Sequence, residues 1–398
     1  MKKIRIGLLM IFSIGIVFLL AFLVTQKPLK TLKTESTSEK KEIVDTAKMA
    51  NLTIVGDFLY EEPYYDALKN GEDENLYFSK VKKYFQNDDL SIGNMEVVIG
   101  NDNLKPSGSN FSFCAPESVG RQVVGLGMDV LSTANNHSND RGQEGRNSTI
   151  DFFANNSNIL TVGTFKDERD ILKNIKTVND IKFGFLAYTY GTNIKIPAEL
   201  RNKIGLYRDP DGKDHGQYEK LMREEISTMR KEVDVLIVIM HWGVEFTYTP
   251  KEAERNLASM MNALGVDIII GSHSHSIEPI EWIKSDHGET LVYYSMGNFV
   301  SADDDISRTG ETFDNAYQMG LLSTLQIEKD KNGIYIRDVQ TTPIINYFDE
   351  NMRNFQLVPL DEYTSDLETS HFRYKYNFDR NFIENAYETV IDSEFRKK

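Results

Sequence analysis

The chain has 398 residues, of which 40% are hydrophobic and 11% aromatic, a composition typical of an ordinary folded protein. Its formal net charge of −15 excludes non-specific nucleic-acid binding, which depends on a basic surface, so no nucleic-acid partner is expected. The single cysteine, Cys114, excludes an intrachain disulfide framework and any cysteine-based zinc site.

Residues 1–24 have the pattern of a membrane anchor. Lys2, Lys3 and Arg5 precede an unbroken run of low polarity at residues 6–24, "IGLLMIFSIGIVFLLAFLV", which as a helix is long enough to cross a hydrocarbon core. Because the basic residues precede this run, we expect a single-pass protein of the cell membrane with a cytoplasmic amino terminus and an extracytoplasmic main domain. A cleaved signal peptide is the less favoured alternative, since the run exceeds an ordinary signal-peptide core and no A-x-A pattern follows it.

Three further segments follow the anchor. Residues 25–49 are rich in Lys, Thr, Ser and Glu and hold too few apolar side chains to offset the entropy of ordering, so they are predicted to form a flexible stalk. Residues 50–345 form the expected main domain. Residues 346–398 are a carboxyl-terminal extension with many Phe and Tyr and an amphipathic helix near residues 382–390. Such aromatics are more typical of docking onto the domain than of a ligand site, and partner binding is the alternative.

The main domain is predicted to be α/β. Apolar blocks alternate with amphipathic stretches at residues 219–232 and 251–264, which indicates β-α-β units. The strand-like blocks are "NLTIVGD", "LSIGNMEVVI", "MDVLSTANNH", "ILTVG", "VDVLIVIMHWG" and "VDIIIGSHSH". Residues 174–190, 278–300 and 321–344 instead resemble hairpins, the last with an Asn332-Gly333 turn. We expect one sheet of crossover strands and another of hairpins, packed face to face with helices outside.

Polar side chains capable of metal chemistry follow five of these blocks. They are Asp57, Asn94, Glu96, Asn136, His137, His241, His273 and His275. Ligands of open α/β sheets bind beyond the carboxyl ends of the strands, so these side chains should meet at one edge. A single histidine there is usually only a hydrogen-bonded loop residue. Their joint occurrence, without a thiolate, instead favours a site for a divalent metal such as Mn²⁺, Fe²⁺ or Zn²⁺.

The ordered series "GDFLY", "GNMEV", "ANNHSND", "HWGVEF", "GSHSH" and "YSMGNF" resembles the CapA/PgsA family of poly-γ-glutamate capsule proteins, a branch of the calcineurin-like metallophosphoesterases. The resemblance covers residues 51–343, most of the chain beyond the stalk. It implies a four-layer α-β-β-α sandwich, here preceded by one transmembrane helix. It also implies two metal ions that activate a bridging water.

The resemblance assigns roles residue by residue. The implied metal ligands are Asp57, Glu96, Asn136, His241, His273 and His275. His137 corresponds to a general acid that protonates the leaving oxygen. Two positions depart from the wider superfamily, because Leu59 replaces a histidine ligand and Asn94 replaces a bridging aspartate. Glu96 lies two residues after Asn94 and is the expected replacement, but the departures leave open whether the site hydrolyses anything.

Several neighbours are candidates for supporting this site. Asp140 and Glu245 could each accept a hydrogen bond from an imidazole, although an exposed acidic loop residue is an equally good interpretation. Asn298 follows another apolar strand and is expected mainly to form a Gly-Asn turn beside the site. His215, His287 and His371 lie in no motif and are predicted to be surface residues.

The resemblance implies a membrane-anchored, extracytoplasmic component of poly-γ-glutamate capsule synthesis and export, working beside an ATP-dependent amide ligase and a small membrane protein. Because the polymer is a polyanion and the chain has a net charge of −15, contact has to be local, through metal ions or basic residues such as those of residues 166–176. Acidic residues alternate with the basic ones in that segment, so a solvated mixed-charge surface is its favoured interpretation. Two alternatives stay open. One is an extracytoplasmic metal-dependent phosphoesterase or hydrolase acting on an envelope polymer, and the other is a non-catalytic scaffold of the synthase complex.

Overall fold

The computed structural model describes residues 47–109, 112–213, 216–303 and 311–397. The expected anchor at residues 1–24 and the stalk up to residue 46 lie outside the described residues, and the first strand already begins at Lys48. Among the described helices, none combines the length and the apolar character that a membrane crossing requires.

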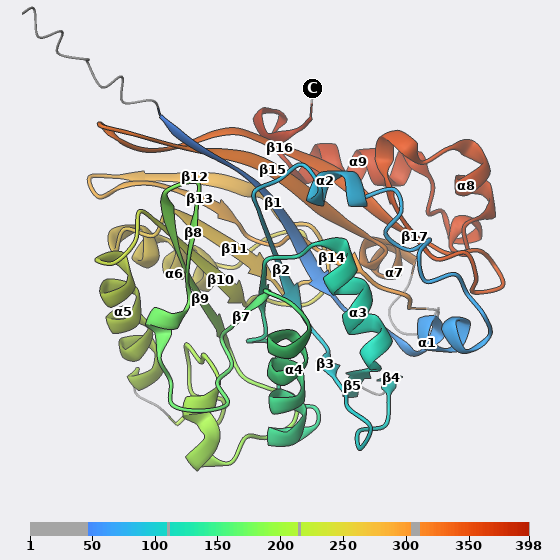
Figure 1. Ribbon diagram of the computed structural model, residues 1–398. Helices are drawn as coiled ribbons and strands as arrows, with labels where there is room; N and C mark the ends of the chain where they lie inside the picture. Colours follow the sequence, from blue (N-terminus) through green and yellow to red (C-terminus); the bar gives the residue numbers. More distant parts are fainter. Residues whose placement is uncertain (1–46, 110–111, 214–215, 304–310, 398) are drawn as a thin grey trace, which may run out of the picture. The chain divides into compact units, whose positions relative to one another are not determined.

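The first of two large sheets has a parallel centre and an antiparallel edge (Figure 1). Its parallel strands are β1 (Lys48–Phe58), β2 (Leu90–Met95), β6 (Val130–Ser132) and β7 (Leu160–Val162). On the other side of β1 it continues through antiparallel β15 (Met319–Asp330), β16 (Gly333–Tyr347) and β17 (Gln356–Pro359). The short strand β14 (Asn298–Val300) also pairs with β1, in parallel.

The second large sheet repeats this plan with an antiparallel strand at each edge. Its parallel strands are β13 (Gly288–Tyr293), β11 (Ile268–Ser272), β10 (Val235–His241) and β9 (Ile181–Thr189). The edges are β12 (Ile280–Ser285) and β8 (Ile175–Val178). A small separate sheet holds β3 (Val98–Ile99), β5 (Ser112–Ala115) and β4 (Ser107–Ser109).

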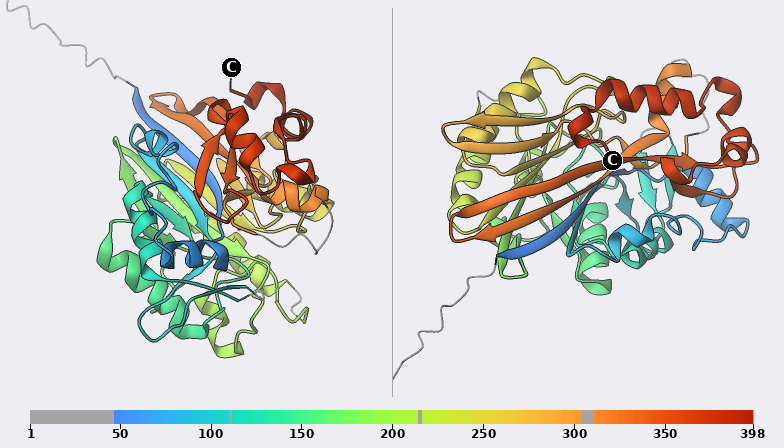
Figure 2. Two further views of the ribbon diagram at one scale, coloured as in Figure 1. Left: turned by 90° about the vertical axis from the view of Figure 1, so that its right-hand side faces the viewer. Right: turned by 90° about the horizontal axis from the view of Figure 1, so that it is seen from above.

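The two sheets pack face to face, with helices on both outer faces (Figures 1 and 2). Alternation along β10 shows the arrangement, since Ile237 and Ile239 join the core between the sheets while Val238 and Met240 join the helix-covered core. The second sheet is covered by α5 (Gln217–Arg230) and α6 (Glu252–Ala263). The first is covered by α1 (Glu62–Lys69), α2 (Lys82–Phe85), α3 (Glu117–Leu126) and α4 (Gly142–Asn156). Parallel strands buried on both faces account for the continuous apolar runs in the sequence.

The α/β class and the three hairpins are confirmed. The prediction that one sheet holds the crossover strands and the other holds the hairpins is wrong. The hairpins β8–β9, β12–β13 and β15–β16 extend the edges of sheets whose centres are parallel, so both sheets are mixed. An alternating pattern indicates a strand pair but carries no information on which free edge the pair extends. The helices expected at 219–232 and 251–264 are α5, which begins and ends two residues earlier, and α6, which is one residue shorter at each end.

The carboxyl-terminal residues pack on the first sheet. Beyond β17 lie α8 (Ser365–Ser370) and α9 (Arg380–Val390), the helix expected near residues 382–390, and α7 (Glu311–Tyr317) precedes β15. Ile383 and Tyr387 of α9 are buried in the core that contains β16, and Tyr387 Oη donates to the Thr341 carbonyl. These residues therefore pack onto the domain, as expected.

His371 is not a surface residue, contrary to the expectation. Its ring packs at 4.8 Å from Phe378, and its Nε2 lies 3.0 Å from the Asn346 carbonyl oxygen. Burial lowers the pKa of His371 to about 3, so the ring is neutral. A histidine without a motif gives no sequence signal that separates a satisfied core residue from an exposed one.

We predict that Gly271→Ala, in the middle of β11, lowers the free energy of unfolding by about 1–3 kcal/mol. An added Cβ would lie 1.9 Å from the Tyr294 carbonyl oxygen and 2.6 Å from Trp242 Nε1, both of which are held in the core. The matched control is Gly125→Ala in α3, where an added Cβ meets nothing within 4 Å and should stabilise the helix by about 0.5–1 kcal/mol. Urea unfolding of both variants tests this, and equal effects would contradict it.

Candidate metal centre

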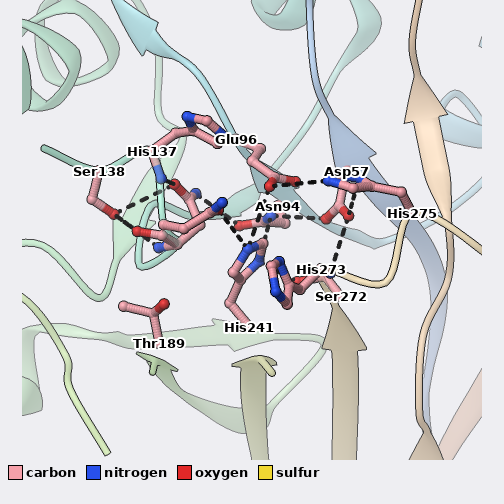
Figure 3. A network of polar contacts seen from close by, with 12 residues as sticks. Asp57, Asn94, Glu96, His137, Ser138, Thr189, His241, Ser272, His273 and His275 are labelled. Atoms are coloured by element: carbon pink, nitrogen blue, oxygen red, sulfur yellow. Dashed lines mark hydrogen bonds and ion pairs between the residues drawn. The ribbon is translucent and has the colours of Figure 1, made fainter. Parts of the chain in front are cut away.

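The side chains singled out in the sequence come from strand ends of both large sheets and meet in one buried cluster (Figure 3). Asp57 lies near the end of β1 and Asn94 near the end of β2, with Glu96 just beyond. His241 ends β10, and His273 follows β11. Because the sheets face each other, the carboxyl ends of strands from separate layers approach the same point.

Asp57 is fixed by hydrogen bonds from both sheets. Asn94 Nδ2 donates to Asp57 Oδ1 at 2.8 Å, and the His273 backbone N–H donates to Asp57 Oδ2 at 3.2 Å. Burial raises the pKa of the Asp57 carboxyl, while His275 and these two donors oppose the shift. Asn94 therefore acts here as a donor that orients a carboxylate.

Glu96 is fully buried, and neither of its carboxylate oxygens accepts a hydrogen bond from the described residues. Burial, reinforced by the neighbouring Asp57, raises the pKa of Glu96 well above its ordinary value. Within the part of the chain that the structure describes, no lysine or arginine pairs with Asp57 or Glu96. A buried carboxylate of this kind is costly unless a cation or a proton accompanies it.

His241 presents one ring nitrogen to the cluster. Its Nδ1 lies 2.9 Å from Ser272 Oγ, and its Nε2 lies 2.8 Å from Asn136 Oδ1 and 3.3 Å from Glu96 Oε1. Burial, with a contribution from His273, lowers the pKa of His241 well below its ordinary value, so the ring is neutral. The neutral imidazole, through the lone pair of its unprotonated nitrogen, is the form in which histidine binds metals.

His273 and His275 lie in the irregular turn after β11. Both have a left-handed backbone, with φ of 97° and 53°, which is unusual for residues with a side chain. This conformation turns both rings toward the cluster. His275 Nδ1 lies 2.9 Å from Asn298 Oδ1, which leaves Nε2 for the site, whereas His273 Nδ1 is buried without a partner in the described residues.

The described residues form three groups of possible ligand atoms, of which two share Glu96. One is Glu96, His241 and His273, and the other is Asp57, Glu96 and His275. Within each group the ligand atoms lie within 4.8 Å of one another. Two buried carboxylates, neutral imidazoles and unpartnered Glu96 and His273 atoms fit a centre for borderline divalent metals.

His137 borders this cluster and is oriented by Asp140. His137 Nδ1 lies 2.7 Å from Asp140 Oδ2, which also accepts the backbone N–H of Phe113 at 2.6 Å. Because an ionised carboxylate only accepts hydrogen bonds, this contact places a proton on Nδ1. The remaining nitrogen, Nε2, is then the one that can exchange a proton with a ligand.

Among the remaining candidates, Asn298 differs from its expected conformation, whereas Glu245 and Leu59 agree with the expectations. Asn298 belongs to strand β14, where it pairs with Asp57 of β1, and the left-handed residue is the preceding Gly297 with φ of 64°. Glu245 is exposed, but its carboxylate falls in a third group with His273 and His275. Leu59 is buried in the apolar core beneath α1 and provides no ligand atom.

Sequence reasoning missed three residues that shape the cluster. Ser272 contacts His241, the Tyr190 ring packs 4.8 Å from the His273 ring, and Asn135 Nδ2 donates to Asn94 Oδ1 at 3.2 Å. Ser272 and Asn135 are direct neighbours of motif residues, so proximity in the chain could have found them. Tyr190 follows β9, where the sequence carries no signal beyond the strand end.

Comparisons with known proteins show which family the chain resembles. The family model described as "Bacterial capsule synthesis protein PGA_cap" matches residues 51–303. "PGA biosynthesis protein CapA" of Bacillus subtilis (strain 168) is 29% identical over 251 residues, 62% of this chain and 62% of that protein. "Capsule biosynthesis protein CapA" of Bacillus anthracis is 28% identical over 258 residues, 63% of this chain and 59% of that protein.

A more distant relative, a "Probable polyglutamine synthesis accessory protein" of Mycobacterium tuberculosis, is 27% identical over 177 residues, 43% of this chain and 45% of that protein. The alignments thus span about three fifths or less of these relatives. Among solved structures, the calcineurin-like phosphoesterase YfkN from Bacillus subtilis superposes with a TM-score of 0.42 and 15% identity, covering 86% of this chain and 100% of that chain.

We predict that Glu96→Gln stabilises the metal-free protein at pH 8 by about 1–3 kcal/mol. Folding raises the pKa of Glu96, so its favourable contribution is complete below the ordinary glutamate pKa and is lost as the pH rises through the folded-state pKa. The gain should therefore be larger at pH 8 than at pH 5, as measured by urea unfolding with a chelator present.

The matched control is Glu225→Gln, which removes a buried carboxylate that pairs with Arg169 at 2.6 Å. This change should lower the free energy of unfolding, because it leaves the guanidinium without its partner. A Glu96→Gln variant that is destabilised like the control at pH 8 would contradict the interpretation of Glu96 as an uncompensated charge.

Proposed function

This chain belongs to the bacterial capsule synthesis protein PGA_cap family, and we propose that it is a membrane-anchored, extracytoplasmic component of poly-γ-glutamate capsule synthesis and export with a divalent-metal centre. The observation that carries the metal centre is Glu96, a buried carboxylate that belongs to two of the possible ligand groups and accepts no hydrogen bond from the residues that the structure describes. The names of the relatives concern capsule biosynthesis and polyglutamine synthesis, which supports the assignment to capsule synthesis.

The metal centre would be held by carboxylate, imidazole and amide groups of the cluster. Asp57, Glu96 and His275 would form one side, and Glu96, His241 and His273 the other, with Asn136 beside His241. Manganese, iron and zinc suit this donor set. A bound divalent ion supplies a Lewis acid and lowers the pKa of water, and its charge would compensate the two buried carboxylates.

The cellular setting is part of the same proposal. Residues 6–24 have the length and the preceding positive charges of a single-pass anchor whose following domain faces outward. In this setting the domain would act on or guide the emerging polymer, beside an amide ligase that makes the γ-glutamyl bonds and a small membrane subunit. Removal of the anchor would then uncouple the domain from the machinery at the membrane.

A second candidate, hydrolysis of an envelope polymer or phosphoester, is favoured by one specific observation. Asp140 holds His137 with a proton on Nδ1, so that Nε2 is free to carry a proton to a leaving oxygen at the edge of the cluster. Hydrolysis needs a proton donor beside the metal centre, whereas a structural metal site does not. The non-catalytic scaffold is therefore an outcome to be tested.

We predict that His275→Gln lowers surface poly-γ-glutamate by at least about tenfold in the source bacterium, because it removes a metal ligand. The matched control is His287→Gln, an exposed histidine in the turn between β12 and β13 that belongs to no motif, which should leave the polymer at the wild-type level. Polymer is measured on washed cells, and immunoblots of membrane fractions show that both variants are present and membrane-bound.

Wild-type polymer levels in the His275→Gln strain would reject a functional metal centre and favour the scaffold. Recovery of the protein in the soluble fraction would reject the proposed anchor. Loss of polymer in both histidine variants would mean that the effect is not specific to the cluster.

For the hydrolytic candidate, we predict that His137→Ala lowers metal-dependent turnover of phosphodiesters by about 10²–10⁴-fold without changing metal content. The loss should be greater for a phenyl ester than for a p-nitrophenyl ester, because the poorer leaving group depends more on protonation. Equal losses for both esters would contradict a general-acid role. Absence of turnover by the metal-loaded wild type with any ester would reject this candidate.

A further inference from the structure

Arg208 lies beside the candidate metal centre with most of its hydrogen-bonding capacity unused. Its guanidinium carbon is 5.0 Å from the centre of the Tyr190 ring and 6.0 Å from that of Tyr207. Its Nε donates to the Tyr190 carbonyl at 3.4 Å, and within the described residues neither terminal nitrogen has an acceptor. The side chain is exposed, yet two aromatic rings and this backbone contact restrain it.

Two basic residues near Arg208 in the chain, Arg201 and Lys195, are neutralised by carboxylates, whereas within the described residues Lys203 donates only to the backbone carbonyl of Asp167. Arg201 pairs with Asp209 and Asp211, and Lys195 also reaches Asp211. Arg208 forms no ion pair among the described residues, although it directly precedes Asp209. The carboxylates of Asp209 and Asp211 therefore pair with Arg201, and among the described residues the Arg208 guanidinium has no carboxylate partner.

Tyr190 connects Arg208 to the metal centre. The same ring that lies under the guanidinium packs 4.8 Å from the His273 ring, and it lies 6.3 Å from the His241 ring at an interplanar angle of 15°. One aromatic side chain therefore separates Arg208 from two candidate metal ligands. A group bound by Arg208 would lie next to anything bound at His273.

The overall charge explains why a cation is needed there. The net charge of −15 repels anions, and in ordinary salt this repulsion is screened only beyond about 8 Å. The basic segment at residues 166–176, considered above as a polymer contact, does not meet the need. Lys166 pairs with Asp151, Lys173 with Asp170 and Lys176 with Asp129.

We propose that Arg208 is an oxyanion-binding subsite that takes a carboxylate or phosphoryl group of the molecule whose reacting part lies at the metal centre. This inference rests on the proposed function, since it identifies the substrate of that centre as a polyanion. The two free terminal nitrogens form a planar fork that matches two oxygens of a carboxylate or phosphate. Tyr190 positions the fork beside His273.

The test is calorimetric titration of the full-length, Mn²⁺-loaded protein with two probes, inorganic phosphate and γ-linked tetraglutamate. Arg208→Gln should weaken binding of at least one probe by about tenfold, the effect of about 1.4 kcal/mol. Arg208→Lys should restore part of the loss, because it keeps the charge without the fork. The control is Arg223→Gln, which removes an exposed arginine of α5 that pairs with Glu219. Mn²⁺ affinity should be unchanged in all variants.

The outcomes separate this inference from the proposed function. A loss confined to tetraglutamate identifies a γ-glutamyl carboxylate as the ligand, and a loss confined to phosphate identifies a phosphoryl group. Equal affinities of wild type and Arg208→Gln for both probes, or no binding by the wild type, would overturn the subsite. If the wild type fails to bind Mn²⁺, the proposed centre is rejected, and the same titrations without metal decide the subsite by the same tenfold criterion.

Discussion

The electrostatics of the candidate site depend on two neighbouring buried carboxylates, Asp57 and Glu96. Among the described residues, no lysine or arginine pairs with either of them. Desolvation and mutual repulsion penalise such a pair unless a proton or a metal cation accompanies it. Surrounding neutral imidazoles add lone pairs rather than positive charge. A divalent cation, as proposed above, would compensate both carboxylates, and the imidazoles would supply further ligand atoms.

The packing of two sheets face to face brings these carboxylates and the histidines together. Asp57 and Glu96 follow strands of one sheet, while His241, His273 and His275 follow strands of the other. Neither sheet alone could assemble the donor set. The contact from the His273 backbone to Asp57 joins the two halves, and the left-handed conformations of His273 and His275 show that the turn after β11 is held against its local preference.

Much of this arrangement could be predicted from the sequence, for a physical reason. Strand ends in α/β sheets collect polar side chains, so Asp57, His241 and the His273–His275 pair could be assigned to one rim, and the hairpin at Asn332-Gly333 followed from turn chemistry. What escaped prediction depends on tertiary packing. Pairing of hairpins with particular sheet edges, burial of His371 and the position of Tyr190 against His273 are set by contacts between distant segments.

Metal content tests the central claim most directly. Full-length protein is stripped with a chelator, reloaded with Mn²⁺ or Zn²⁺, dialysed and assayed by elemental mass spectrometry, beside Glu96→Gln and the paired-carboxylate variant Glu225→Gln. The account predicts that wild type and Glu225→Gln retain the metal, whereas Glu96→Gln binds it at least about tenfold more weakly. Failure of the wild type to retain either metal, or equal retention by Glu96→Gln, would contradict it.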